Sequence, residues 1–133
     1  MRRFHWTPEH TVFQPEFDAE HRELFRLGDD LQHALESGAD TQQVEEKTRL
    51  LTTDFDAHMA HEERLMLAAS YSGYEWHKRQ HDAARTRLES LRTQPEELLA
   101  YLHGWLADHT GVADRMMAAA LRNAGRTSEP PSS

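Results

Sequence analysis

Apolar residues recur every three to four positions over most of the chain, which is the spacing of one face of an α-helix. Only a few helix breakers interrupt this pattern, chiefly Gly38, Gly73 and Pro95. They divide the chain into four long segments. The first two are predicted to be helices over residues 18–36 and 40–69, each opened by an aspartate that can act as the N-cap.

The third and fourth segments each follow a capping-box sequence, Ser72-Gly73-Tyr74-Glu75 and Thr93-Gln94-Pro95-Glu96. In a capping box, the hydroxyl and the carboxylate accept hydrogen bonds from the first free amides of a helix. Short turns between long helices favour antiparallel neighbours. We therefore predict an all-α fold, an up-down-up-down antiparallel four-helix bundle with an irregular N-terminal arm over residues 1–17. We expect a single domain over residues 1–126 and a disordered polar tail at 127–133.

Each predicted helix carries at least one histidine in the apolar stripe that faces the bundle interior. The four stripes, in chain order, are Phe17, His21, Leu24, Gly28, Leu31 and Leu35; Val44, Thr48, Leu51, Phe55, His58, Glu62, Leu65 and Ala69; Tyr74, His77, His81, Ala84, Leu88 and Leu91; and Leu98, Leu102, Trp105 and His109. Burying an unpaired polar group costs a few kcal/mol, and an unpaired carboxylate costs more. One core histidine is usually satisfied by a backbone carbonyl or a carboxylate, but five on four helices point to a metal as their common partner.

Two pairs in these stripes have the spacing of metal ligands. His58 and Glu62 are four residues apart, as are His77 and His81. Residues four apart lie on the same face of a helix, so each pair projects toward a shared point.

Asp114 is a further candidate ligand, although it is out of phase with the stripe of its helix. It follows His109 by five residues, which places it roughly 140° around a regular α-helix. The apolar stripe itself continues in phase only if one residue is inserted here, after which Asp114 and Met117 face inward. We therefore predict a local π-type widening around residues 110–111, a feature that often occurs at functional sites.

Composition narrows the classes of protein and site. The chain has 133 residues and 38% hydrophobic residues, enough for one core, and no apolar run near the ~18 residues that could span a membrane. The start, MRRFHW, lacks the apolar stretch of a signal peptide, so we expect a soluble, cytoplasmic protein. A net charge of −8 argues against nucleic acid and anionic membrane surfaces as partners. Because the chain has no cysteine, histidines and carboxylates must carry any metal chemistry.

The number of candidate ligands indicates two metal ions. Five histidines together with Glu62 and Asp114 exceed the four ligands of a structural Zn site. Two ions with about six ligands each need about twelve donor positions. Five imidazoles, two bridging carboxylates and one bridging solvent oxygen fill about eleven of them, which leaves about one for a small diatomic ligand. Imidazole and carboxylate suit Zn, Fe, Mn, Cu and Ni, so the ligand types do not select the metal.

Five motifs spread over nearly the whole chain are HW near the start, DAEHREL at 18–24, HMAHEERLM at 58–66, GYEWHKRQH at 73–81 and WLADHTGVAD at 105–114. Together they resemble the hemerythrin family, whose members are di-iron, O2-binding four-helix bundles. The resemblance implies two non-haem irons, one held by three histidines and the other by two, with two carboxylates and an oxo or hydroxo group as bridges. The iron with three histidines would be held by His77, His81 and His109. The other would be held by His21 and His58, and the bridging carboxylates would be Glu62 and Asp114. It also implies that O2 binds at the second, less crowded iron.

The same resemblance predicts the residues that line the O2 pocket, which are Leu24, Phe25, Met59, Leu106 and Thr110. Two of them depart from the family pattern, because Met59 stands where Phe is usual and Thr110 where a branched aliphatic residue is usual. Met59 is interpreted as a flexible gap-filler. The Thr110 hydroxyl either admits water or a proton to the open position, which would hasten oxidation of the iron, or bonds its own helix backbone.

The remaining histidines fall outside the inward stripes and are interpreted as surface residues; they are His5, His10, His33, His61 and His103. Each ligating imidazole needs a partner for its other nitrogen; Asp18, Asp54 and Asp108 are candidates, and capping or an ordinary surface position is the alternative for each. His61 and Glu63 flank Glu62 and are further candidates, although Glu63, like Glu20, is interpreted as ordinary solvated charge. Trp6 is expected to pack the arm over the bundle end.

Reversible O2 binding, for carriage, storage or delivery, is the first functional hypothesis, with NO and peroxide as other ligands to consider. A second is a sensor of O2, NO or redox state, against which the lack of a linker or output domain argues. A third is a di-iron peroxidase, oxidase or NO reductase. Such enzymes typically have carboxylate-rich sites, so the chain is not expected to be an enzyme. Iron handling is a fourth hypothesis, which seven protein ligands would resist. We expect a monomer whose protein partner is unknown.

Overall fold

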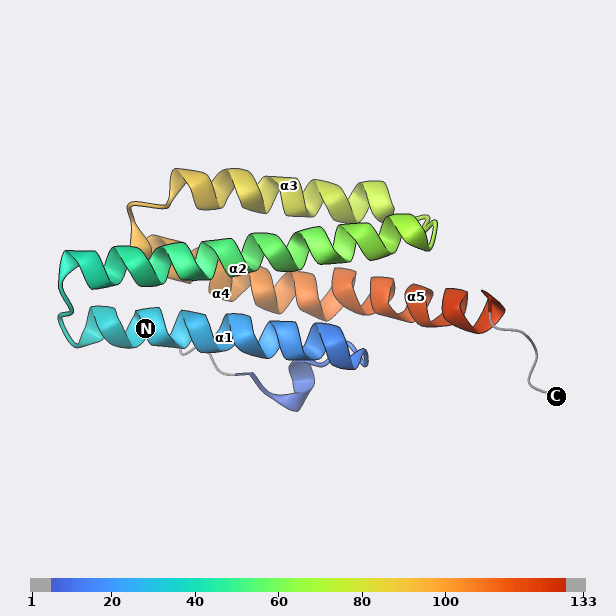
Figure 1. Cartoon of the computed structure of the whole chain (residues 1–133), viewed down its shortest axis with the longest axis horizontal. Helices are drawn as coiled ribbons and strands as arrows, with labels where there is room; N and C mark the ends of the chain where they lie inside the picture. Colours follow the sequence, from blue (N-terminus) through green and yellow to red (C-terminus); the bar gives the residue numbers. More distant parts are fainter. Residues whose placement is uncertain (1–5, 129–133) are drawn as a thin grey trace.

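The computed structural model describes residues 6–128, and the helices in this range form an antiparallel four-helix bundle (Figure 1). The elements are η1 (Pro8–His10), α1 (Pro15–Glu36), α2 (Thr41–Ala68), α3 (Tyr74–Ser90), α4 (Pro95–His109), η2 (Thr110–Asp114) and α5 (Arg115–Ser128). The last three are continuous and form the fourth rod of the bundle. The predicted all-α, up-down-up-down architecture is confirmed.

The helix starts agree with the sequence prediction at one of four places. Asp40 caps α2 as expected, because its side chain accepts a hydrogen bond from the Gln43 amide at 2.8 Å. In contrast, α1 begins at Pro15, three residues before Asp18, since the Gln14 side chain accepts from the Phe17 amide. The irregular arm is therefore shorter than predicted and contains the short helix η1.

Both predicted capping boxes are wrong. The N-cap of α3 is Gly73 and that of α4 is Gln94, so Ser72 and Thr93 each lie one residue outside the cap. At α4 the physical reason is Pro95, which occupies the first helical position. Proline favours that position because its fixed φ suits a helix and its missing N–H is not needed there.

The predicted π-type widening is confirmed, since η2 is a π-helical turn that covers Thr110–Asp114. After it, α5 continues to Ser128 and extends past the ends of the other helices, at the red end of the ribbon (Figure 1). The helix thus passes residue 127, where the sequence predicted a disordered tail to start. The rest of that segment lies outside the described residues.

Two apolar clusters fill the bundle and leave a polar layer between them. The larger cluster includes Leu24 on α1, Met59 on α2 and Leu106 on α4. The smaller one consists of Val12, Phe17, Met66, Met117 and Ala118. On each of these three rods the two clusters are separated by the predicted ligand positions, for example Phe17, His21 and Leu24 along α1. The candidate ligands therefore cross the core as one layer.

The N-terminal arm is tied to both α1 and α5. Asp18 accepts hydrogen bonds from the Thr11 hydroxyl at 2.6 Å and from the Val12 amide at 2.8 Å. Arg115 and Arg122 of α5 donate to backbone carbonyls of residues 11–13 at 2.9 to 3.2 Å. Asp18 is therefore committed to the arm, and its predicted role as a partner of a ligating histidine is wrong.

Trp6 is half-buried against the larger cluster, as expected for a residue that packs the arm onto the bundle, and the Arg22 guanidinium lies 4.2 Å from its ring centroid. Within residues 6–128, none of the helices is both long enough and apolar enough to cross a membrane.

Candidate metal centre

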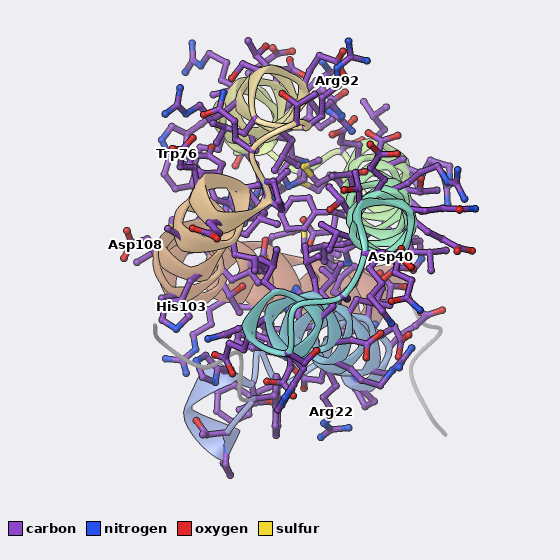
Figure 2. The ribbon with its side chains drawn as sticks, turned by 90° about the vertical axis from the view of Figure 1, so that its left-hand side faces the viewer. Arg22, Asp40, Trp76, Arg92, His103 and Asp108 are labelled. Atoms are coloured by element: carbon purple, nitrogen blue, oxygen red, sulfur yellow. The ribbon has the colours of Figure 1, made fainter. Side chains whose placement is uncertain are left out.

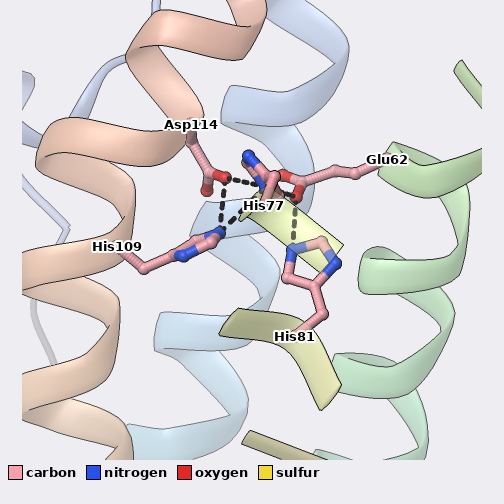
Figure 3. Close-up of side chains that lie close together, drawn as sticks. All are labelled: Glu62, His77, His81, His109 and Asp114. Atoms are coloured by element: carbon pink, nitrogen blue, oxygen red, sulfur yellow. Dashed lines mark hydrogen bonds and ion pairs between the residues drawn. The ribbon is translucent and has the colours of Figure 1, made fainter. Parts of the chain in front are cut away.

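The seven predicted ligands come from all four rods and meet inside the bundle. His21 lies on α1, His58 and Glu62 on α2, His77 and His81 on α3, and His109 and Asp114 at the last residue of α4 and the last residue of η2. All seven are buried, with relative exposures of 5% or less. Figure 3 shows five of them, with the carboxylates of Glu62 and Asp114 facing the three imidazoles of His77, His81 and His109.

The seven side chains form two overlapping groups of donor atoms. One group is Glu62, His77, His81, His109 and Asp114, and the other is His21, His58, Glu62 and Asp114. Within each group, one donor atom from every residue lies within 4.8 Å of all the others, a spread that suits a single ion. The groups share only the two carboxylates, so three histidines lie on one side of them and two on the other.

Each shared carboxylate faces both groups. Glu62 places Oε1 3.0 Å from Nε2 of His81 and Oε2 3.0 Å from Nε2 of His58. Asp114 places Oδ1 2.8 Å from Nε2 of His109 and Oδ2 3.2 Å from Nε2 of His21. The two oxygens of one carboxylate thus point to different groups, which is the arrangement that a bridging ligand requires.

The π-helical turn brings Asp114 to the site. In a regular α-helix, a residue five positions after His109 would point roughly 140° away from it. The extra residue in η2 removes most of this difference, so His109 Nε2 and Asp114 Oδ1 lie 2.8 Å apart. The same insertion keeps Met117 and Ala118 of α5 in the smaller apolar cluster.

Three of the five imidazoles bind a side chain through their outer nitrogen. Nδ1 of His58 donates to Glu20 at 2.6 Å, and Nδ1 of His81 donates to Glu63 at 2.8 Å. Nδ1 of His109 donates to the Gln80 side-chain oxygen at 2.7 Å. The predictions that Glu20 and Glu63 are ordinary solvated charge are therefore wrong.

The aspartates predicted for this role do not fill it. Asp108 points away from the bundle (Figure 2), and His109 binds Gln80 instead. Asp54 lines the same surface groove as Glu20, but the hydrogen bond of His58 goes to Glu20.

The three partners share one pattern, although the sequence offered only Glu63 among them as a candidate. Each follows or precedes a candidate ligand by one residue and bonds a histidine of the next helix along the chain, from α1 to α2, from α2 to α3 and from α3 to α4. Their position beside a ligand is visible in the sequence. The rotation that turns them toward the neighbouring helix is not, because it depends on how the helices pack.

These outer hydrogen bonds decide where the lone pairs of the imidazoles point. A neutral imidazole has one N–H, and where Nδ1 donates it, Nε2 is left as an acceptor. Nε2 of His58 and of His81 each face a carboxylate oxygen of Glu62 at 3.0 Å, so acceptors face acceptors. Among the described residues, Glu62 Oε2, His81 Nε2 and both Asp114 oxygens are buried without a hydrogen-bond partner. Cations between these atoms would remove the repulsion, and the residues present therefore fit metal ions.

Without cations, the charges of the site favour bound protons. Burial opposes a charge on His58, but the Glu62 carboxylate and the hydrogen bond to Glu20 outweigh it and raise the pKa of His58 to about 10. Burial also opposes a charge on His77, but the carboxylates of Asp114 and Glu62 beside it outweigh this and raise its pKa to about 9. Although burial works to raise the pKa of Glu62, the histidines around it hold that pKa well below its ordinary value. Metal binding here must displace protons.

The histidines predicted to lie on the surface divide into two kinds. His33 is exposed and lies near Asp29, as predicted, and His103 is partly exposed on the outer side of α4 (Figure 2). His61 is only partly exposed and shares the Glu20 carboxylate with His58, at 2.6 Å. His10 is also partly exposed; it accepts from the Thr7 amide and packs against the ring of Phe25. His5 lies outside the described residues.

The five residues predicted to line a ligand pocket are all buried. Leu24, Phe25, Met59 and Leu106 belong to the larger apolar cluster, which lies against the ligand layer. Thr110 is 1% exposed, and its hydroxyl has no hydrogen-bond partner among the described residues. The interpretation in which this hydroxyl bonds its own helix backbone is therefore wrong.

Comparison with known proteins agrees with this geometry. Residues 13–121 match the family model described as the hemerythrin HHE cation binding domain. The chain belongs to the hemerythrin family. It is 29% identical to myohemerythrin of Sipunculus nudus over 110 residues, which cover 82% of this chain and 86% of that protein. It is 30% identical to a hemerythrin subunit of the same organism over 116 residues, 84% of this chain and 87% of that protein. No solved structure matches the chain significantly.

Proposed function

We propose that this hemerythrin-family protein holds two non-haem irons and binds O2 reversibly, as a carrier, store or donor of oxygen. The observation that carries the proposal is the pair of overlapping donor groups that share Glu62 and Asp114. One ion would take His77, His81 and His109, and the other His21 and His58, while the two carboxylates and an oxo or hydroxo group would bridge them. An iron pair of this kind can supply electrons to O2 and recover them when O2 leaves.

The unequal division of histidines supports an open position on one side only. The group with three histidines has five protein donors, whereas the group with His21 and His58 has four. A ligand from solution would therefore bind on the His21 and His58 side. The buried side chains of Leu24, Phe25 and Leu106 keep bulk water from this part of the bundle.

The ligand types favour binding of O2 over its activation. Enzymes that activate O2 at di-iron sites in helical bundles use a carboxylate-rich ligand set with Glu-x-x-His motifs. Here five imidazoles face two carboxylates, so the ions would receive mostly neutral ligands. Such a site does not favour the high oxidation states that oxygen activation needs.

A surface groove between α2 and α3 lies beside one residue of the predicted pocket. A groove of about 230 Å³ is lined by Met59, Leu88 and Arg85, among others, and so reaches a residue of the predicted pocket. Methionine side chains are flexible and unbranched, and Met59 can move to admit a diatomic molecule.

The test is an oxygenation cycle. The metal-free protein is loaded anaerobically with ferrous iron, exposed to O2 and purged with inert gas, while the visible charge-transfer absorption and the iron content are followed. Repeated gain and loss of colour with about two irons per chain is expected. His58→Ala should abolish the cycle, whereas His33→Ala, on the exposed face of α1, should retain it. A single irreversible change would instead favour oxidase or sensor chemistry, and no change would refute O2 binding.

A further inference from the structure

Arg85 on α3 connects the surface of the bundle to one of the candidate ligands. Its Nη1 lies 2.8 Å from Oε2 of Glu63, and the same Glu63 oxygen accepts the Nδ1 proton of His81 at 2.8 Å. The guanidinium is held in place by Asp56 on α2, at 2.9 Å, and by Asp82 on α3, at 3.0 Å. One carboxylate oxygen is therefore shared between a metal-facing imidazole and a fixed cation.

This arrangement differs from those at the other two histidines that have outer partners. Glu20 accepts protons from two imidazoles, those of His58 and His61, and within residues 6–128 it forms no ion pair with an arginine or a lysine. His109 donates to Gln80, a neutral amide. Of these three histidines, His81 alone has an outer acceptor that is a carboxylate paired with a permanent cation.

The charge state of Arg85 does not vary with pH. Burial opposes its charge, but Glu63 and Asp56 outweigh this and raise the pKa of Arg85 above its already high ordinary value. The pair is also partly shielded from water, because the Glu63 side chain is 15% exposed and that of Arg85 28%. The interaction is therefore stronger than that of a fully exposed ion pair.

A carboxylate that accepts the outer proton of an imidazole makes its other nitrogen more basic and a stronger metal donor. A cation on the same carboxylate oxygen withdraws part of that electron density, so it weakens the effect. Stronger donation stabilises the ferric state more than the ferrous state, because the ferric ion carries the higher charge. Arg85 thus acts on the balance between the two states without contacting the metal site.

We propose that Arg85 is a positioning residue that, through Glu63, limits how strongly His81 donates to its ion and so favours the ferrous form that binds O2. The inference rests on the proposed function only for the presence of iron at His81, and not for the binding of O2.

The experiment is an anaerobic redox titration of the iron-loaded protein. Arg85→Gln should lower the midpoint potential. We expect the ratio of ferrous to ferric protein at a given potential to fall about tenfold, which corresponds to ~59 mV for one electron. Glu63→Gln should raise it, because a neutral acceptor strengthens His81 less. Arg85→Lys should stay near the original value. Arg87→Gln is the matched control, since it removes the same charge from another position on the same helix, away from Glu63, and should leave the potential unchanged.

A double-mutant cycle separates this role from a purely structural one. In the Glu63→Gln background, Arg85→Gln should no longer shift the potential, because its effect passes through Glu63. A residue that only holds α2 against α3 would lower the melting temperature in both single variants and leave the potential unchanged. That result, or a shift that persists without the Glu63 carboxylate, would overturn the inference. If the potentials shift as expected but O2 is not bound reversibly, the proposed function fails and the role of Arg85 stands.

Discussion

The metal-free protein is predicted to lose stability as the pH rises from 7 to 9. The pKa of His58 is raised to about 10 in the folded protein, whereas an unfolded chain releases this proton near 6.5. The stabilisation is therefore complete below pH 6.5 and is lost as the pH rises toward 10. The lowered pKa values of Glu62 and Asp114 have the opposite sign, because their contribution is lost only in acid, as the pH falls below the carboxylate range.

The size of the effect follows from the number of protons held. One extra proton in the folded state makes the free energy of unfolding fall by ~1.4 kcal/mol per pH unit, or about 2.7 kcal/mol from pH 7 to 9. His77, with its pKa raised to about 9, adds to this loss over the first part of the range. In the metal-loaded protein the ions replace these protons, so its stability should not fall over the same range.

Urea denaturation followed by far-UV circular dichroism measures this directly, at pH 7, 8 and 9, with and without metal. His58→Gln is the matched variant, since it keeps a polar side chain in α2 but cannot hold the proton, and its pH dependence should be smaller. A free energy of unfolding that stays constant or rises between pH 7 and 9 in the metal-free protein would refute the assignment of protons to these histidines.

Three further predictions concern single positions. Deleting Gly111 should return the π-helical turn to an α-helix and rotate Asp114 by roughly 100°, so iron content should fall below that of Gly111→Ala, whose added Cβ meets no atom within 4 Å. Thr110→Ile should slow autoxidation of the iron-loaded protein relative to Thr110→Ser, because it removes a buried hydroxyl without a partner among the described residues; an unchanged or faster rate would contradict this. Leu102→Ala, at a fully buried core position, should cost about 2 to 5 kcal/mol in urea denaturation, and a loss below about 1 kcal/mol would show that the core relaxes around it.

The inward-facing part of the site could be predicted from the sequence because it depends on positions within single helices. The four-residue spacing of His58 and Glu62 fixes a shared face without knowledge of any neighbour. The break in phase before Asp114 likewise appears in one helix, so the π-helical turn could be inferred from it. Both predictions hold in the folded protein because the ligands and the apolar core residues lie on the same face of each helix.

The outer partners could not be assigned from the sequence, although Glu63 was one candidate, because they depend on contacts between helices. Glu20 and Glu63 have the composition and helical phase of ordinary surface carboxylates, and only the rotation of α1 against α2 and of α2 against α3 brings them to His58 and His81. The predicted starts of the third and fourth helices were wrong for a local reason. Ser72 and Thr93 match a favoured cap by type, but both helices start one residue later, and at α4 the reason is that Pro95 takes the first helical position.

The hydrogen bonds between the N-terminal arm and α5 can form only late in folding. The carbonyls of residues 11–13 are bound by arginines that follow them by 104 to 110 residues in the chain. During synthesis residues 11–13 emerge long before these arginines, so until α5 exists the arm can be held by Asp18 of α1 but not yet by α5. Closing so long a loop also carries a large entropic cost, which only a formed bundle can repay. The contacts between the arm and α5 therefore form late, after the last helix has packed into the bundle.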